Sequence, residues 1–245
     1  MAELPEIEVL RPDWPAPPNV RAFTTTRNGG CSQGPWSSLN LGKNCGDNPQ
    51  HVAQNRRSLL RLLPSEPRWL NQVHGTHVAD WDKASEPGAD AIVSRTPGQV
   101  CSVLTADCLP VLFCNLSGTR IAAAHAGWRG LAAGVLEATV LAMGCKPVEL
   151  MAWLGPAIGP QVFEVGKDVY AAFINVNPGN ATAFKPHRDR WLADLYQLAR
   201  LALGRLGIVQ VSGGQHCTYL EQDQFFSYRR DGQTGRMLTA AWLTG

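Results

Sequence analysis

The sequence lacks several features that mark common protein classes. Its seven cysteines are an odd number and include no Cys-x-x-Cys pair, which disfavours a disulfide framework and a zinc ribbon. No window approaches the roughly 18 apolar residues of a membrane-spanning helix, and the N-terminus has neither the basic start nor the apolar run of a signal peptide. The formal net charge is only +2, and the arginines are scattered. We therefore expect a cytoplasmic protein with reduced thiols that binds neither membranes nor nucleic acid.

The composition that is present is that of an ordinary folded protein. Of the 245 residues, 44% are apolar and 17% are charged. No linker, repeat or low-complexity segment divides the chain, and strand and helix patterns alternate without a regular βαβ rhythm. We expect an α+β fold: one mixed domain over residues 1–245, with central β-sheets covered by helices in an αββα layering like that of cysteine hydrolases. Residues 1–20 are expected to form a proline-rich lead-in.

Several stretches have the β-branched and apolar composition of strands and are bounded by turn residues. They span residues 21–26, 100–105, 111–114, 120–125 and 149–154. Near the C-terminus, residues 225–229 and 237–242 are predicted to pair as a hairpin across Asp231-Gly232.

Helix boundaries are marked by capping residues. Asp47-Asn48-Pro49 predicts a helix start, because an Asx cap followed by proline pre-sets the first turn, and this helix should stop before Pro64. A second helix is expected after Gly130 and should close at Gly144. A third is predicted over residues 190–206, where apolar residues recur at roughly helical spacing.

Three side chains of metal-binding type stand at strand ends or beside glycine turns. They are His74 in Asn-Gln-Val-His-Gly, Cys108 in Thr-Ala-Asp-Cys, and His125 in Ala-His-Ala-Gly-Trp-Arg-Gly. Imidazole and thiolate are ligands that zinc prefers, and a catalytic zinc site typically has three protein ligands and one open position. Their wide spacing suits ligands that converge from separate elements. The residues alone leave another interpretation open, in which Cys108 is a small buried hydrophobe and the histidines are structural.

A set of longer motifs extends over nearly the whole chain, from about Arg21 to Trp242. In order, they are Thr-Arg-Asn-Gly-Gly-Cys-Ser, Ser-Leu-Asn-Leu-Gly, Asn-Gln-Val-His-Gly, Thr-Ala-Asp-Cys-Leu-Pro-Val, Ala-His-Ala-Gly-Trp-Arg-Gly, Leu-Gly-Pro-Ala-Ile-Gly-Pro, Phe-Phe-Ser-Tyr-Arg-Arg-Asp-Gly and Thr-Gly-Arg-Met. This set resembles the YfiH/laccase-domain family, also called the polyphenol oxidase or peptidoglycan editing factor family. One departure is Cys45, where the family tends to have an apolar residue.

The resemblance implies both a cofactor and an activity. It implies that His74, Cys108 and His125 bind one zinc ion. It also implies phosphorolysis of purine nucleosides, in which adenosine or inosine and phosphate give the free base and ribose 1-phosphate, with adenosine deamination as a side activity. The expected partners are therefore a purine nucleoside and phosphate, and we expect a monomer.

The name polyphenol oxidase suggests copper, but the histidine count argues against a multicopper site. A type 1 copper site takes two histidines and a cysteine, and a trinuclear cluster needs roughly eight more imidazoles. The chain has six histidines in all: His51, His74, His77, His125, His187 and His216. Copper could occupy the zinc site, because its intrinsic affinity exceeds that of zinc. It is the less favoured metal here.

Four further residues are candidates for catalysis or substrate binding, each with a structural alternative. Asp107 could act as an acid or base or support its neighbour Cys108, although strand alternation would point it away. Arg27, before Gly29-Gly30, could clamp phosphate as a catalytic and binding residue, or be a surface arginine. Arg129, at a helix start, could bind an anion or only pack. Asn40 could bind ribose or stabilise a turn.

Other side chains are less favoured. His77 is predicted to face away from His74 if the chain after Gly75 is extended. Cys217 is expected to be a core thiol, and Tyr228, Arg229 and Arg230 to be solvated hairpin residues rather than a cover for a ligand.

Two other functional classes stay open. The first is hydrolytic: an amidase that edits a peptidoglycan precursor, or a cysteine hydrolase in which His125 activates Cys108 as a nucleophile. The second is a non-enzymatic, metal-stabilised binding protein, which would have a fourth protein ligand on the metal.

Overall fold

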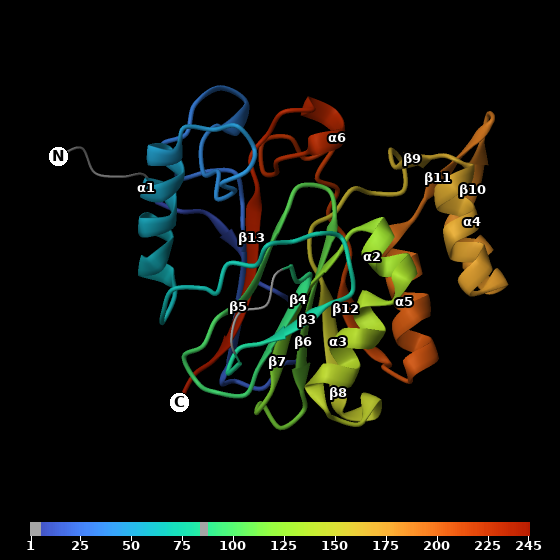
Figure 1. Ribbon diagram of the computed structural model, residues 1–245, viewed down its shortest axis with the longest axis horizontal. Coiled ribbons are helices and arrows are strands. Elements are labelled where there is room, and N and C mark those ends of the chain that lie inside the picture. Colours follow the sequence, from blue (N-terminus) through green and yellow to red (C-terminus); the bar gives the residue numbers. More distant parts are fainter. Residues whose placement is uncertain (1–5, 84–87) are drawn as a thin grey trace.

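Two β-sheets stacked face to face form the centre of the computed structural model, which describes residues 6–83 and 88–245 (Figure 1). The larger sheet has the strand order β12-β8-β6-β7-β4-β3 and mixes parallel and antiparallel pairs. Every residue of its central strands β6 and β7 is buried, as expected of strands covered on both faces. Its strands are β3 (Val78–Asp80), β4 (Ala91–Ser94), β6 (Leu109–Asn115), β7 (Ile121–Ala126), β8 (Leu150–Leu154) and β12 (Gln210–Gly213).

The second sheet is antiparallel and joins the two ends of the chain. Its strands, in the order β1-β2-β13-β5, are β1 (Val9–Leu10), β2 (Val20–Thr25), β13 (Met237–Leu243) and β5 (Cys101–Thr105). β13 pairs with β2 on one side and with β5 on the other. The predicted lead-in therefore contains a strand, β1, and its first five residues lie outside the described part of the chain.

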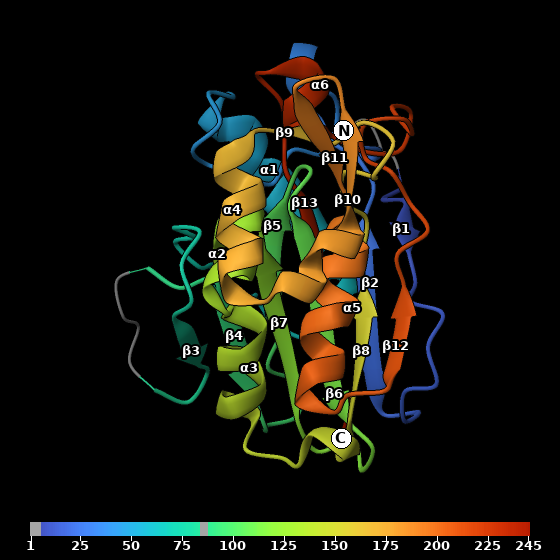
Figure 2. The same ribbon diagram turned by 90° about the vertical axis from the view of Figure 1, so that its right-hand side faces the viewer.

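Helices cover the outer face of each sheet, which confirms the predicted αββα layering (Figures 1 and 2). On one side, α1 packs Leu59 against Phe23 and Leu238 of the antiparallel sheet. On the other, α3 and α5 pack residues such as Leu136 and Leu198 against the larger sheet. The helices are α1 (Pro49–Leu59), α2 (Trp128–Ala133), α3 (Val135–Met143), α4 (Lys167–Val176), α5 (Leu195–Leu206) and α6 (Tyr228–Asp231).

The space between the two sheets is filled by buried apolar side chains from both of them. Among them are Val20, Ile92, Cys101, Val103, Leu112, Ile121, Met151, Trp153 and Ala241. Cys101 and Cys114 are thus core thiols, and all seven cysteines are free. Within the described residues, no helix has the length and apolarity needed to cross a membrane.

Shorter elements complete the fold. A small antiparallel sheet, β10-β11-β9, consists of β9 (Glu164–Val165), β10 (Phe184–His187) and β11 (Arg190–Ala193). The 3-10 turns are η1 (Gly34–Trp36), η2 (Leu60–Leu62), η3 (Pro147–Glu149) and η4 (Pro178–Ala183).

The predicted start of the first helix is confirmed. The Asn48 side chain accepts a hydrogen bond from the backbone N–H of Gln50, and Pro49 is the first residue of α1. The α-helix ends at Leu59, and η2 continues the chain towards Pro64.

Three other predictions about elements are wrong. The helix expected up to Gly144 does close at Gly144, which caps α3 with φ +61°, but it is two helices, because Gly134 takes φ +98° between them. The helix expected from Arg190 starts at Leu195, after β11. The C-terminal hairpin does not form: residues 228–231 are helix α6, and β13 pairs with β2 and β5 instead.

Candidate metal centre

His74, Cys108 and His125 meet at one end of the two sheets. His74 lies in the loop before β3, Cys108 in the turn between β5 and β6, and His125 near the end of β7. The Cys108 Sγ lies 3.8 Å from the His74 Nε2, and the two imidazole rings meet edge to face at 4.7 Å. The donor atoms of all three side chains lie within 4.8 Å of one another.

Strand pairing explains why these side chains converge. β6 and β7 are antiparallel, with Pro110 opposite His125, so Cys108 stands just beyond the strand end next to that histidine. β4 pairs with the other edge of β7, with Ala91 opposite Ala124. That register brings Asp90, which precedes β4, beside His125.

Asp90 holds both histidine-bearing segments. This carboxylate is fully buried and accepts a hydrogen bond of 2.8 Å from the His125 Nδ1. It also accepts from the backbone N–H groups of Val73, His74 and Gly75, at 2.6 to 3.1 Å. Because the Nδ1 of His125 is bonded to Asp90, its Nε2 is left for the metal position, an arrangement common among metal-binding histidines.

Two glycines allow the ligands to approach so closely. A Cβ at Gly127 would lie 2.9 Å from the Cys108 Sγ and 3.0 Å from the His74 Cδ2. A Cβ at Gly130, in α2, would lie 2.8 Å from the carbonyl oxygen of Gly75. Any larger residue at either position would therefore move a ligand or the His74 loop.

The electrostatics of the site favour a thiolate. Burial alone raises the pKa of the Cys108 thiol, but the neighbouring His125 and His74 lower this pKa overall to about 6. Burial alone lowers the pKa of His125, but the charge of Cys108 and the hydrogen bond that the His125 Nδ1 donates to Asp90 raise this pKa to about 9. Without a metal ion, the two side chains thus favour a thiolate–imidazolium pair at neutral pH.

This pair predicts an unusual alkylation profile for the metal-depleted protein. Because the thiolate is the reactive form, the rate of Cys108 alkylation by iodoacetamide should rise with pH to a plateau, with a midpoint near pH 6. Mass spectrometry of the peptide that contains Cys108 measures this rate. The buried Cys114, whose pKa burial raises to about 12, should react slowly throughout and serves as the internal control. A Cys108 midpoint near pH 9 would contradict the interpretation.

A cavity of about 700 Å³ opens next to the three ligands, which form part of its wall. Other charged, polar and aromatic side chains along it are Lys43, Arg56, Trp69, Asn71, Tyr228 and Arg236. The Arg56 guanidinium stacks on the Trp69 ring, with 3.6 Å from Cζ to the ring centroid, and burial lowers the pKa of Arg56 to about 10. The cavity therefore combines cationic side chains with flat aromatic surfaces.

The donor set and the cavity fit a catalytic zinc ion. Zinc binds imidazole nitrogen at about 2.0–2.1 Å and thiolate sulfur at about 2.3 Å, so two nitrogens and one sulfur on one tetrahedral ion lie roughly 3.3–3.6 Å apart. The sulfur–nitrogen separation of 3.8 Å is close to that range. His74 is exposed and Cys108 is half-buried, so the group is open to the cavity.

Arg27 and Asn40, two of the predicted substrate-binding residues, do not line this cavity. The Arg27 guanidinium donates to the backbone carbonyls of Ser37 and Gln222. Asn40 is fully buried, and its amide donates to Gly42 and Asp47. In this structure both side chains are engaged in holding loops together.

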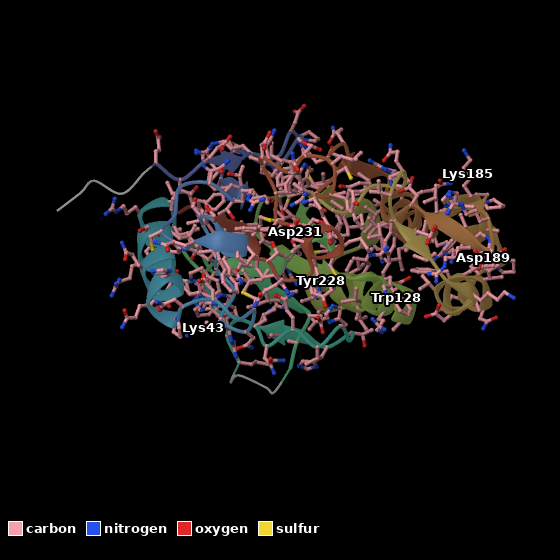
Figure 3. All side chains as sticks on the ribbon, turned by 90° about the horizontal axis from the view of Figure 1, so that it is seen from above. Lys43, Trp128, Lys185, Asp189, Tyr228 and Asp231 are labelled. Atoms are coloured by element: carbon pink, nitrogen blue, oxygen red, sulfur yellow. The ribbon has the colours of Figure 1, made fainter. Side chains whose placement is uncertain are left out.

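The side chains of Asp107 and Arg129 do not line this cavity either. Asp107 was expected to turn away from Cys108 by strand alternation, but it lies in the turn after β5 with φ +87°, and its carboxylate accepts hydrogen bonds from the Thr218 hydroxyl and the Arg229 backbone N–H. Arg129 stacks on Trp128 and lines a second cavity of about 530 Å³ beside α4. Seen from above in Figure 3, Tyr228 lies between Lys43 on one side and Trp128 on the other.

Sequence reasoning missed Asp90, Arg56 and Trp69. Asp90 stands in Gly-Ala-Asp-Ala, directly before an apolar strand. A lone acidic residue in that position is the one sequence feature that could have indicated a buried, functional carboxylate. Arg56 is one of two adjacent arginines in α1, and only the fold shows that it turns towards the cavity. Tyr228, which was expected to lie in a hairpin and not to cover a ligand, is 60% exposed but lines the cavity. Cys217 is a core thiol, as expected.

Comparison with known proteins places this geometry in context. The family model described as multi-copper polyphenol oxidoreductase laccase matches residues 21–244. An Escherichia coli K12 protein named purine nucleoside phosphorylase YfiH is 54% identical over 240 residues, covering 96% of this chain and 99% of that protein. A Pseudomonas aeruginosa protein, also named as a purine nucleoside phosphorylase, is 53% identical over 236 residues, covering 96% and 98%.

Two solved structures are similar over the same extent. The crystal structure of a Neisseria meningitidis protein has a TM-score of 0.93 and 55% identity, and the match covers 97% of this chain and 99% of that one. The crystal structure of YlmD from Geobacillus stearothermophilus has a TM-score of 0.91 and 29% identity, covering 100% and 98%.

Proposed function

The chain belongs to the family described as multi-copper polyphenol oxidoreductase laccase, and from this premise we propose that it is a zinc-dependent purine nucleoside phosphorylase. Relatives about half identical over nearly their full length are named as purine nucleoside phosphorylases. The observation that carries the proposal is the cavity that ends on His74, Cys108 and His125. Its volume of about 700 Å³ is within the range typical of small-molecule sites.

The proposed reaction exchanges one bond at the anomeric carbon of the nucleoside. A phosphate oxygen bonds to C1′ of the ribose while the N-glycosidic bond breaks. The electron pair of that bond goes to the purine, which takes up a proton and leaves as the free base. The second product is ribose 1-phosphate. Because the pentose carbon becomes cationic and the purine anionic on the way, the site must hold both partners and limit the access of water.

The lining side chains suit these two partners. Lys43 and Arg236 are cations on the wall, where they can bind phosphate oxygens. The Tyr228 ring and the Trp69 ring offer flat surfaces on which a purine can stack. Arg56 donates its Nε and Nη2 to the carbonyl of Leu41, so its main proposed role is to fix the Trp69 ring.

His74, Cys108 and His125 would hold the zinc ion. When bound there, zinc supplies Lewis-acid chemistry next to the phosphate or a ribose hydroxyl. Asp90 keeps the His125 ring oriented through its Nδ1 and keeps the His74 loop in place through three backbone bonds. Adenosine deamination is proposed as a side activity of the same cavity, since zinc chemistry also supports attack at the amino-bearing carbon of a purine.

The copper interpretation of the family name is not adopted. A multicopper set would need several further histidines near the group, but three of the others are engaged elsewhere: His51 with Asp47, His187 with Glu164, and His216 with Glu221. Copper bound in place of zinc at the same three ligands stays a less favoured alternative.

One observation favours a second candidate, a cysteine hydrolase. The lowered pKa of Cys108 beside His125 is the arrangement that activates a thiolate nucleophile. Such an enzyme could cleave an amide, including one in a peptidoglycan precursor. A thiolate that coordinates zinc is a poor nucleophile, so the metal content of the active protein separates the two candidates.

The test is an assay of purified protein containing one zinc ion per chain, with inosine in the presence and absence of phosphate. Phosphorolysis predicts hypoxanthine and ribose 1-phosphate in equal amounts, formed only when phosphate is present. Removing the metal with a chelator should abolish this turnover, and restoring zinc should recover it. Amide cleavage that survives complete metal removal, together with no phosphate-dependent turnover, would instead favour the cysteine hydrolase.

A further inference from the structure

Asp107 is the residue before Cys108, and both of its carboxylate oxygens accept hydrogen bonds from the C-terminal part of the chain. One oxygen accepts a hydrogen bond of 2.6 Å from the hydroxyl of Thr218, which is fully buried. The other accepts a hydrogen bond of 2.6 Å from the backbone N–H of Arg229, in the first turn of α6. The Asp107 side chain is itself buried, and it does not line the cavity next to the three ligands.

From this geometry we propose that Asp107 is a positioning residue that ties the turn carrying Cys108 to helix α6, and is not the acid or base of the reaction. The helix matters because its first residue, Tyr228, lines the cavity. One carboxylate thus positions two side chains that line the cavity. The first is the thiol of Cys108, the next residue in the sequence, and the second is the ring of Tyr228, about 120 positions further along the chain. The kinetic part of this inference rests on the proposed function, but the structural part does not.

The backbone at Asp107 is also held in an uncommon conformation. Its φ of +87° lies in the left-handed region, which Asp and Asn adopt more readily than other residues with side chains. Its carbonyl accepts a hydrogen bond of 3.0 Å from the N–H of Ile158, and the adjacent Ala157 accepts one from the N–H of Thr218. The turn is therefore braced by residues 157 and 158, and this segment is itself hydrogen-bonded to Thr218, which supplies the hydroxyl partner.

Helix α6 depends on such outside support. It has only four residues, and a single helical turn is not stable by itself in water. The first free N–H groups of the helix are satisfied by Asp107 at Arg229 and by the Ser227 hydroxyl at Arg230. The Arg229 guanidinium donates to the Glu164 carbonyl, and that of Arg230 donates to the Thr218 carbonyl. Without the Asp107 carboxylate, we expect the first turn to fray and Tyr228 to lose its fixed place.

The experiment compares Asp107→Asn with Asp107→Ala. Asparagine tolerates a positive φ, its amide oxygen can accept from the Arg229 N–H, and its NH₂ group can donate to the Thr218 hydroxyl; it cannot transfer a proton as a carboxyl group does. A positioning role predicts that Asp107→Asn keeps kcat for phosphorolysis within about threefold of the wild type. Asp107→Ala should lower kcat/KM by roughly 10²-fold, the order of effect that misplaced site groups have. An acid or base role predicts that kcat and kcat/KM fall by about 10² to 10⁴-fold, and equally, in both variants. That result would overturn the proposal.

Hydrogen–deuterium exchange supplies a readout that does not depend on turnover. In zinc-loaded protein, the peptide covering residues 225–232 should exchange at least about tenfold faster in Asp107→Ala, while Asp107→Asn should keep the protection of the wild type. Unchanged exchange in Asp107→Ala would overturn the proposal, even if the protein catalysed no phosphorolysis. If Asp107→Ala does not fold, Thr218→Val takes its place, because it removes one of the two hydrogen-bond partners of the Asp107 carboxylate. It should speed hydrogen exchange in the same peptide. An unchanged exchange rate in Thr218→Val would count against the proposal.

Discussion

Replacing Cys108 with alanine is expected to remove bound zinc and phosphorolysis together. The thiolate is one of the three proposed ligands, and two imidazoles alone would form a far weaker zinc site. The zinc content should fall from about one ion per chain to near zero, and kcat/KM should fall by on the order of 10³-fold, since Lewis-acid catalysis contributes several kcal/mol. Mass spectrometry of the metal content and an assay with inosine and phosphate measure the two quantities.

Cys114→Ala is the matched control for this variant. Cys114 lies on β6, the strand that Cys108 precedes, but it is fully buried in the core between the sheets. Its replacement should cost some stability, about 1 kcal/mol for a small cavity, and leave zinc content and kcat unchanged. Full zinc content in Cys108→Ala, or loss of zinc in both variants, would count against the proposed ligand set.

Replacing Asp90 with alanine is expected to affect both the metal and the stability of the fold. The change leaves the N–H groups of Val73, His74 and Gly75 without their acceptor and frees the His125 ring. Loss of such a supporting carboxylate typically weakens metal binding by about 10 to 100-fold. Removing one member of a buried, hydrogen-bonded pair costs about 3–5 kcal/mol. At roughly 2–4 °C per kcal/mol for a chain of this size, Tm should fall by about 6–20 °C.

Calorimetry and competition with a zinc chelator measure these two effects, and Asp189→Ala is the control. Asp189 is exposed in the loop between β10 and β11, on the opposite side of the molecule from the cavity-lining Lys43 (Figure 3). Its removal should change Tm by no more than about 1 °C, because surface substitutions usually cost within 0.5 kcal/mol. An Asp90→Ala protein with wild-type Tm and zinc affinity would contradict the role assigned to Asp90.

Asp90 should also make stability depend on pH at the acidic end. Burial raises the pKa of this carboxyl, but its bonds from His125 and from Gly75 outweigh burial and lower the pKa in the folded state. A lowered folded-state pKa means that the carboxylate stabilises the fold above the unfolded-state pKa of about 3.9, and this contribution is lost as the pH falls through the folded-state value. In Asp90→Ala, this part of the acid-induced loss of stability should be missing.

The three side chains of the candidate metal centre could be picked out from the sequence because their chemistry is distinctive, and the structure brings them together. Two histidines and a cysteine beside strand ends or glycine turns, within motifs that resemble one family, mark His74, Cys108 and His125 without any structure. Asp90 was not marked, because its importance comes from the register of β4 against β7, which local sequence does not encode. Arg27 and Asn40 have side chains suited to substrate binding, yet the fold directs them to backbone carbonyls and a buried carboxylate.

The errors in secondary structure share a physical cause, which is competition from distant or local contacts. β13 was expected to pair with residues just before it, but its partners β2 and β5 lie more than 130 residues earlier. Residues 190–193 have helical periodicity, yet they pair with β10, and the Asp194 side chain then caps α5 by accepting from the Gln197 N–H. Gly134 interrupts an apolar helical stretch that otherwise had no stop signal.

We propose that one divalent ion, held by two imidazoles and one thiolate, makes this cavity a phosphorolytic site. A titration of zinc into metal-free protein tests this proposal, with the rate of ribose 1-phosphate formation from inosine and phosphate as the readout. We expect no activity at the start and a linear rise that ends sharply at one zinc ion per chain. Full activity before any zinc is added, or no activity at one equivalent of bound zinc, would contradict it.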